Sequence, residues 1–395
     1  MSSAAPTGWM GPAPAGDSAP TGWVPLVSRE TGSEADSEHD RPTVSRETAG
    51  VASPFPTVPG VARAADLAGD ERSPSATPMA RAAQSVVSRR LRLAEQPALD
   101  PPEQTRVIVV ANQKGGVGKT TSTVNLAAAL ALAGQRVVVL DLDPQGNAGT
   151  AFGVGHSEGT PGTYDVLVEG VAIADVLQPA ADLANVRVLP ASIDLAGAEI
   201  ELVSMVARET RLKRALDSLL AAGVAVDYVL IDCPPSLGLL TVNAMVAAQE
   251  LLIPIQCEYY ALEGLGQLQR NIDLIRAHLN PDLQLSTILL TMYDARTRLA
   301  AQVAQEVRDH FGDRVLRAVI PRSVRVSEAP SYQQTVLQYD ASSPGALSYA
   351  EAARELARRP PGGSPADSAT GRTSTGPASN SPASNSPAFA RWANH

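Results

Sequence analysis

Cysteine and long apolar runs are scarce in this chain of 395 residues, and each shortage excludes a class of protein. The two cysteines, Cys233 and Cys257, are too few for a disulfide framework and indicate a reducing compartment. No apolar run approaches the roughly 20 residues that cross a bilayer. The N-terminus also lacks the basic segment and apolar core of a signal peptide. We therefore expect a cytoplasmic protein without an integral membrane segment, in which both thiols are small buried fillers.

Proline is unevenly distributed along the chain. Of the 31 prolines, 20 lie in residues 1–104 and 360–395, which are also rich in Ser, Thr, Ala and Gly. Such composition lacks the apolar periodicity that a packed core requires, and it predicts disordered ends. A short basic helix is predicted near residues 79–93, where it would suit a partner or an anionic surface. Residues 105–359 are long enough for one well-buried domain.

Lysine is the rarest of the common charged residues, and its placement is the most informative feature of the chain. Only three of the 32 basic residues are lysines, and two of them, Lys114 and Lys119, flank a glycine-rich stretch. Glycines let backbone N–H groups curl around a phosphate, and the following helix directs its positive end at the same anion. In such a loop Lys119 reaches the phosphates and Thr120 offers its hydroxyl to Mg²⁺. The predicted phosphate-binding residues are Lys114, Gly115, Gly116, Val117, Gly118, Lys119, Thr120 and Thr121.

Two further segments place carboxylates at the ends of apolar strands. Asp141 lies near the end of the strand predicted at Arg136–Leu142, Asp143 follows that strand directly, and Asp232 ends the strand Asp227–Asp232. Ligands bind at this edge of a parallel sheet. One carboxylate of the first pair can orient or deprotonate an attacking water, while the other helps to hold Mg²⁺. Asp232 occupies the second Mg²⁺ position of a phosphate-loop nucleotidase.

The domain alternates predicted strands and helices from Arg106 to Arg359. Alternation of this kind predicts an α/β fold, with a mostly parallel twisted sheet that carries helices on both faces. The helix after the glycine loop is predicted at Thr120–Ala133, and Gly134 closes it at the C′ position.

These segments together resemble the ParA/Soj-type chromosome-partitioning ATPases of the deviant Walker A group, over about residues 105–359. The resemblance implies a slow, Mg²⁺-dependent hydrolysis of ATP by a homodimer that encloses the nucleotide. It implies that Lys114 crosses to the partner's phosphates, that Asp143 positions water, and that Asp141 and Asp232 lie near Mg²⁺. Pro321 and Arg322 correspond to the segment that packs around adenine. The resemblance is carried by residues 112–121, Asp141–Asn147, Pro190–Glu201, Gln256–Gly264, Thr291–Thr297 and Ile320–Ser331.

The resemblance also implies partners. Arg296 and Arg325 match two arginines that the family uses to bind double-stranded DNA without sequence preference, and residues 296–325 contain seven arginines against three acids. A ParB-type centromere-binding protein would trigger hydrolysis and release, which implies a nucleoid-associated location. The N-terminal extension, with Trp9 and Trp23, is a candidate docking segment for a polar scaffold.

Three other functions remain open from the sequence. A MinD-like ATPase that positions cargo on a membrane or protein scaffold would need a C-terminal amphipathic helix, and residues 360–395 have no apolar face. A reductase-type iron protein would need paired cysteines at a dimer-bridging cluster, where neither cysteine is well placed. A tyrosine kinase of the same loop group usually has a tyrosine-rich tail, and neither end contains tyrosine.

Overall fold

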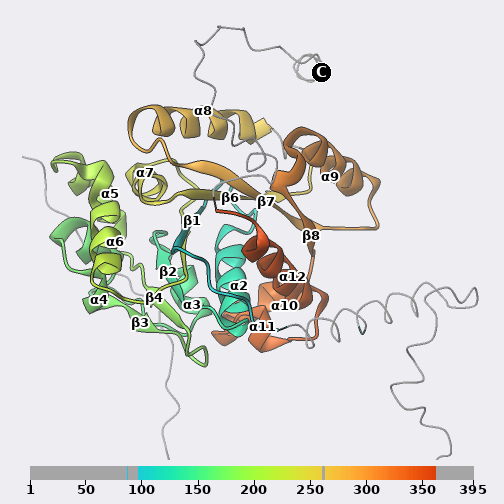
Figure 1. Cartoon of the computed structure of the whole chain (residues 1–395), viewed down its shortest axis with the longest axis horizontal. Helices are drawn as coiled ribbons and strands as arrows, with labels where there is room; N and C mark the ends of the chain where they lie inside the picture. Colours follow the sequence, from blue (N-terminus) through green and yellow to red (C-terminus); the bar gives the residue numbers. More distant parts are fainter. Residues whose placement is uncertain (1–86, 88–96, 260–262, 362–395) are drawn as a thin grey trace, which may run out of the picture. The chain divides into compact units, whose positions relative to one another are not determined.

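The fold is an eight-stranded sheet with a helical layer on each face (Figure 1). The computed structural model describes residue 87 and residues 97–259 and 263–361. The helix predicted near residues 79–93 and the C-terminal tail after residue 361 therefore lie outside the described residues, apart from Val87. The strands are β1 Arg106–Val110, β2 Val137–Asp141, β3 Gln178–Pro179, β4 Val186–Leu189, β5 Tyr228–Asp232, β6 Glu250–Gln256, β7 Gln284–Tyr293 and β8 Val315–Pro321.

The strand order is β3-β4-β2-β5-β1-β6-β7-β8, and every pairing is parallel except that of β3 with β4. The predicted α/β fold class is therefore confirmed. The first strand after the tail, β1, lies between β5 and β6 in the middle of the sheet. Because parallel strands share one carboxyl edge, the segments that follow β1, β2, β5 and β6 converge there.

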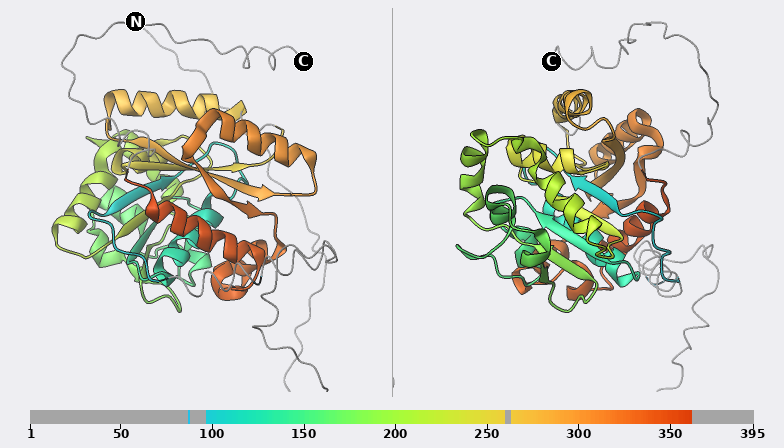
Figure 2. Two further views of the ribbon diagram at one scale, coloured as in Figure 1. Left: turned by 45° about the vertical axis from the view of Figure 1, so that its right-hand side comes forward. Right: turned by 60° about the vertical axis from the view of Figure 1, so that its left-hand side comes forward.

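Both faces of the sheet are buried, as parallel sheets require. Val107 and Val109 of β1 face one apolar core, and Ile108 and Val110 face the other. Figure 2 shows the two helical layers on either side of the strands. The first core packs against α5 Leu195–Val203, α6 Arg211–Ala221, α7 Leu239–Ala247, α8 Glu263–His278 and α9 Arg298–Phe311. The second packs against α2 Lys119–Leu132, α3 Asn147–Ala151, α10 Val324–Glu328, α11 Val336–Tyr339 and α12 Pro344–Arg358.

Helix α2 follows the glycine loop and is almost wholly buried beneath the sheet. Half of its residues are Ala or Leu, which have high helix propensity, and the small alanines allow close packing. Gly134 follows the C-cap with φ of 95°, in the left-handed region that glycine adopts without strain. The prediction that Gly134 closes this helix is thus confirmed, while the helix begins one residue earlier than predicted, at Lys119.

The segment between β2 and β4 contains elements that the sequence did not predict. It forms α3, a π-helical turn at Asp165–Glu169, α4 Ile173–Val176 and the two-residue antiparallel strand β3. These elements are two to five residues long. Such lengths are too short to show a helical or strand period in the sequence. Tertiary contacts therefore determine their conformation.

Candidate functional site

The glycine loop lies at the carboxyl end of β1, between β5 and β6, as the sequence predicted. Gly116 and Gly118 have φ of 74° and 88°, which a side chain would strain. Asn112 braces the loop from its start: its Oδ1 accepts from the Lys114 N–H at 3.0 Å, and its Nδ2 donates to the Pro254 carbonyl at 2.8 Å. From the far side, the Thr291 hydroxyl donates to the Val117 carbonyl at 2.8 Å. Three strands thus hold one anion-binding loop.

Lys119, the first residue of α2, is buried beside this loop with 7% of its surface exposed. Its ammonium donates to the Lys114 carbonyl at 3.4 Å. Burial lowers the pKa of Lys119, and the carboxylates of Asp232 and Asp143 act in the opposite direction. The predicted site residues Lys119, Asp143 and Asp232 are therefore close enough to interact electrostatically.

Asp232 is fully buried at the end of β5, directly beside β1 and β2. Burial raises its pKa to about 7, although the hydroxyls of Thr120 and Thr123 stabilise the carboxylate. The Thr123 hydroxyl donates to Oδ1 at 3.1 Å. Oδ2 has no hydrogen-bond partner among the described residues. A buried carboxylate oxygen without a partner is costly unless a ligand or water satisfies it, and Thr120 and Asp232 are both suitable for Mg²⁺.

The two acids after β2 have different environments. Asp141 is fully buried opposite Asp232 in the strand register, and burial with the negative charge of Asp232 raises its pKa well above the usual range. Its Oδ1 accepts from the Asp143 N–H at 3.0 Å, and its Oδ2 accepts from Ala148 and Gly149 at 3.1 and 3.3 Å. Asp141 therefore fastens the start of α3 to the sheet. Its predicted role near Mg²⁺ stays a prediction.

Asp143 begins the turn that leads into α3. Its Oδ1 accepts from the Gln145 N–H at 3.1 Å, and its carbonyl accepts from the Gly146 N–H at 2.9 Å. The residue as a whole is 9% exposed, so it is held within the site rather than free in solvent. This geometry suits a group that orients a water molecule.

Lys114 lies at the mouth of the site. Its ammonium is 3.6 Å from Oε2 of Glu258, which follows β6, and the two side chains are 39% and 50% exposed. A pair this exposed contributes little to stability and can exchange partners readily. The sequence singled out Lys114 but not Glu258, because the two residues meet only through the pairing of β1 with β6.

The predicted adenine and DNA segments lie together at the far side of the same edge. Pro321 pairs with Tyr293 at the ends of β8 and β7, and the Arg322 N–H donates to the Tyr293 carbonyl at 3.1 Å. Arg296 and Arg325 are exposed, with 87% and 56% of their side-chain surfaces accessible. Arg322 and Arg296 thus both lie near Asp294, whereas Arg325 pairs with Glu328.

Two further site residues, besides Glu258, escaped the sequence analysis. Thr123 lies one helical turn after Lys119, so its hydroxyl reaches both the Lys119 carbonyl and Asp232. That spacing was a usable signal. Asp294 pairs with Arg296 through two hydrogen bonds of 2.9 and 2.8 Å, and this contact lowers the pKa of Asp294 to about 2. The acid two residues before a predicted DNA-binding arginine was visible in the sequence.

Both cysteines are buried, as expected of fillers, with 0% and 5% exposure for Cys233 and Cys257. In the described part of the chain no helix is long and apolar enough to cross a membrane.

Comparison with known proteins decides the family. A family model described as an AAA domain matches residues 105–285. The sporulation initiation inhibitor protein Soj of Bacillus subtilis is 51% identical over 252 residues, which are 64% of this chain and 98% of that protein. The chromosome partitioning protein ParA of Caulobacter vibrioides is 51% identical over 254 residues, 64% of this chain and 94% of that protein. The chain belongs to the ParA/Soj family of chromosome-partitioning ATPases.

Solved structures support the same placement of this ParA/Soj-family protein. A Mycobacterium smegmatis protein described as cobyrinic acid a,c-diamide synthase, solved with ADP and magnesium, is 40% identical. It aligns with a TM-score of 0.56 over 65% of this chain and 95% of that one. The septum site-determining protein MinD of Pyrococcus horikoshii, solved with Mg-ADP, is 27% identical, with a TM-score of 0.53 over 65% of this chain and 97% of that one. The ParA/Soj fold is therefore shared with MinD-type ATPases.

Proposed function

We propose that this ParA/Soj-family protein is an ATP- and Mg²⁺-dependent switch that partitions DNA. The observation that carries the proposal is the grouping of Lys119, Asp143 and Asp232 around one glycine loop, with Lys114 at its mouth. The loop N–H groups and Lys119 bind the phosphates. Thr120 and Asp232 would hold Mg²⁺, whose positive charge would offset the negative charge of the phosphates. Within the described residues no three His, Cys, Asp or Glu side chains form a metal site of their own. Mg²⁺ commonly completes its shell with water and phosphate oxygens.

Hydrolysis in this proposal depends on Asp143. Its carboxylate accepts a hydrogen bond from the attacking water and orients it toward the terminal phosphate. The intrinsic rate is low, and a ParB-type protein accelerates it. Asp141 acts indirectly, because its carboxylate oxygens accept hydrogen bonds from the backbone N–H groups of Asp143, Ala148 and Gly149 and so fix the turn that carries Asp143.

Two subunits close over the nucleotide in the ATP-bound state. Lys114 then leaves Glu258 and contacts the phosphates in the partner subunit. The surface of helix α5, which follows β4 at the same sheet edge, supports this arrangement. Exposed apolar residues lie on and around α5, and they would be covered in a dimer: Ile193, Ile200, Val203 and Val206.

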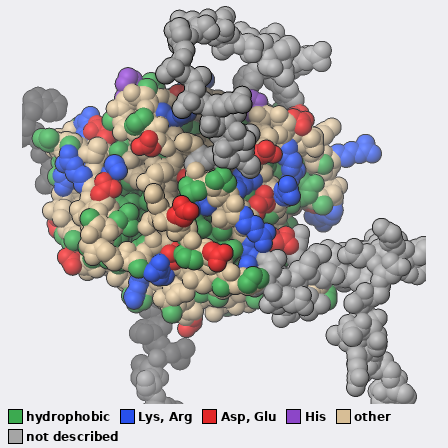
Figure 3. Space-filling view, in the orientation of Figure 1, with side chains coloured by type: hydrophobic (Ala, Val, Ile, Leu, Met, Phe, Trp, Pro, Cys, Tyr) green, Lys and Arg blue, Asp and Glu red, His purple; other side chains and the backbone are tan. Residues whose placement is uncertain are grey.

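The ATP-bound dimer binds double-stranded DNA through Arg296 and Arg325 and stays on the nucleoid until hydrolysis. Figure 3 shows basic and acidic side chains interspersed on the face in view, rather than a single basic field. The chain as a whole has a formal charge of -9, so DNA binding must depend on local arginines. A membrane or protein scaffold, as in MinD-like positioning, is the alternative cargo surface, and the N-terminal extension is its candidate docking segment.

Binding to random-sequence duplex DNA tests this proposal. Asp143→Ala protein should bind with ATP and not with ADP, and binding should weaken roughly 100-fold between 50 and 200 mM salt if four phosphates are contacted per dimer. Arg325→Ala should weaken binding to every sequence and make it less salt-dependent. Arg187→Ala, which removes an exposed arginine on β4, is the matched control. Equal DNA binding with ATP and ADP would contradict the proposal. Equal effects of Arg325→Ala and Arg187→Ala on DNA binding would also contradict it.

Asp294 should restrain DNA binding by Arg296. The carboxylate engages the guanidinium through two hydrogen bonds and also lies in the field of Arg322. Phosphate must compete with this acid, so Asp294→Asn should strengthen DNA binding by about three- to tenfold at low salt. Asp282→Asn makes the same charge change at the opposite end of β7 and should have a smaller effect. Fluorescence anisotropy with labelled duplex measures both, and equal changes would show that only net charge matters.

A further inference from the structure

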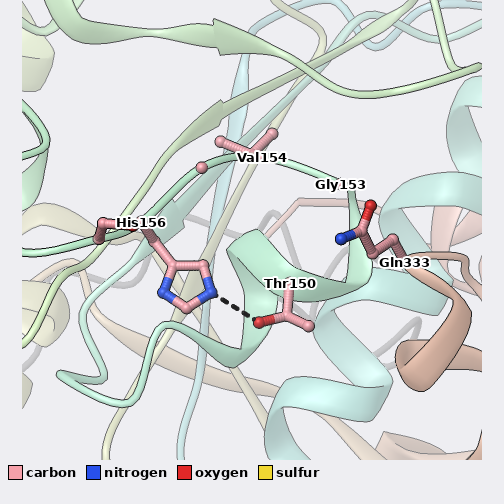
Figure 4. Close-up of a pocket in the computed structure, with 7 residues that line it drawn as sticks. Thr150, Gly153, Val154, His156 and Gln333 are labelled. Atoms are coloured by element: carbon pink, nitrogen blue, oxygen red, sulfur yellow. Dashed lines mark hydrogen bonds between the residues drawn. The ribbon is translucent and has the colours of Figure 1, made fainter. Parts of the chain in front are cut away.

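A histidine that lies outside the glycine loop braces the turn that carries Asp143. His156 follows α3 in a short exposed segment, and its imidazole is half-buried against the start of that helix. Figure 4 shows the ring directed at α3, with Gln333 on the other side of a small pocket. The neighbouring residues Gly155, Ser157 and Glu158 are exposed, so the apolar core does not explain why the ring lies here.

The imidazole contacts α3 at two places. A Cβ at Gly146 would lie 2.5 Å from Nδ1 of His156, so the ring lies directly on the glycine. Its Nε2 is 2.8 Å from the Thr150 hydroxyl. That hydroxyl also donates to the Gly146 carbonyl at 3.2 Å. Because a hydroxyl has one hydrogen, Nε2 donates to Thr150 when Thr150 donates to Gly146.

Gly146 connects this contact to the candidate catalytic group. Its N–H donates to the Asp143 carbonyl at 2.9 Å and closes the turn. The Asp143 carboxylate is in turn oriented within the same turn by the Gln145 N–H. The ring therefore restrains the one glycine through which this turn continues into α3. Small displacements of a positioned catalytic group are costly to rate.

We propose that His156 is a positioning residue for ATP hydrolysis, which acts through Thr150 and Gly146 on the orientation of Asp143. This inference rests on the proposed hydrolytic role of Asp143. Among the described residues the imidazole contacts Thr150 and Gly146 and forms no hydrogen bond with the glycine loop or Asp232, so it affects turnover rather than ATP binding. Its ring lies beside a pocket, so the side chain can be shortened without a cavity in either apolar core.

Steady-state ATP hydrolysis by the full chain tests the inference. His156→Ala should lower kcat about five- to tenfold and leave KM for ATP within about twofold. His156→Gln, which can still donate to Thr150, should recover at least half of the lost kcat. Thr150→Val should reproduce the defect, and the double substitution should be no worse than either single one, because both break one chain of contacts. His310→Ala on α9 is the matched control and should leave both constants unchanged.

The outcomes separate the inference from the proposed function. Asp143→Asn should abolish hydrolysis in the same assay, and an active Asp143→Asn protein would overturn both the role of Asp143 and the bracing inferred here. If Asp143→Asn is inactive while His156→Ala keeps full kcat, only the role of His156 is overturned. An equal loss in His156→Gln and His156→Ala, or a rise in KM that accounts for the defect, would also overturn it. Thermal unfolding within about 3 °C of the unsubstituted protein confirms that the variants are folded.

Discussion

Replacing Asp143 with alanine should lower ATP turnover by at least about 100-fold without abolishing ATP binding. In the proposed mechanism the loop N–H groups and Lys119 bind the phosphates, and these contacts do not involve Asp143. Asp143 is 9% exposed at the same edge of the sheet, where its carboxylate can orient water. An ATP-bound dimer should therefore accumulate, because it forms but does not turn over.

Phosphate release, nucleotide binding and size-exclusion chromatography with ATP measure these three properties. Asp143→Asn is the sharper variant, because its amide oxygen can still accept from the Gln145 N–H while the negative charge is lost. Equal defects in the Ala and Asn variants would assign the effect to the charge and not to the turn. Asp217→Ala, on the exposed face of α6, is the control. Turnover within tenfold of the unsubstituted protein would remove Asp143 from the mechanism.

Replacing Glu250 with alanine should destabilise the domain by roughly 3–5 kcal/mol, because it leaves a buried guanidinium without its counter-charge. Glu250 and Arg106 begin β6 and β1, and their side chains are 1% and 2% exposed. Two hydrogen bonds of 2.7 Å join them. The Arg106 Nη1 also donates to the Leu356 carbonyl at 2.9 Å and so ties α12 to the sheet.

Urea unfolding measures this effect as a lower midpoint with an unchanged slope. Removing both charges with Arg106→Met and Glu250→Leu should restore much of the lost stability, because no unpaired charge remains buried. Asp217→Ala breaks the exposed pair with Lys213 and should change stability little. The pair lies at the amino edge of the sheet, so ATP binding in the folded fraction should be unchanged. If Glu250→Ala lost as little stability as Asp217→Ala, water would have to reach the Arg106–Glu250 pair.

The nucleotide site could be predicted because its signals are local. These signals depend only on residues that are neighbours in the sequence. They are the positive φ angles of Gly116 and Gly118, the helix that begins at Lys119, and the acids at the strand ends. The predicted strands Arg136–Leu142 and Asp227–Asp232 correspond to β2 and β5 and differ from them by one residue at one or both ends. Strand ends are harder to predict because pairing partners determine where a strand stops.

The roles within the site were less predictable, because they depend on contacts between distant segments. The opposition of Asp141 and Asp232 follows from the pairing of β2 with β5. Among the described residues Oδ2 of Asp232 has no hydrogen-bond partner, whereas backbone N–H groups donate to both oxygens of Asp141. From the sequence the two acids look equivalent, since each ends an apolar strand.

The sequence by itself determined the family and the α/β class, and it predicted which residues bind phosphate. Each of these is expressed in short stretches whose backbone preferences and spacing are local. Only the tertiary structure decided which acid keeps a free oxygen, that Glu258 pairs with Lys114, and that His156 lies on Gly146. These contacts require a particular strand order and loop packing, and many strand orders are compatible with the same alternation of strands and helices.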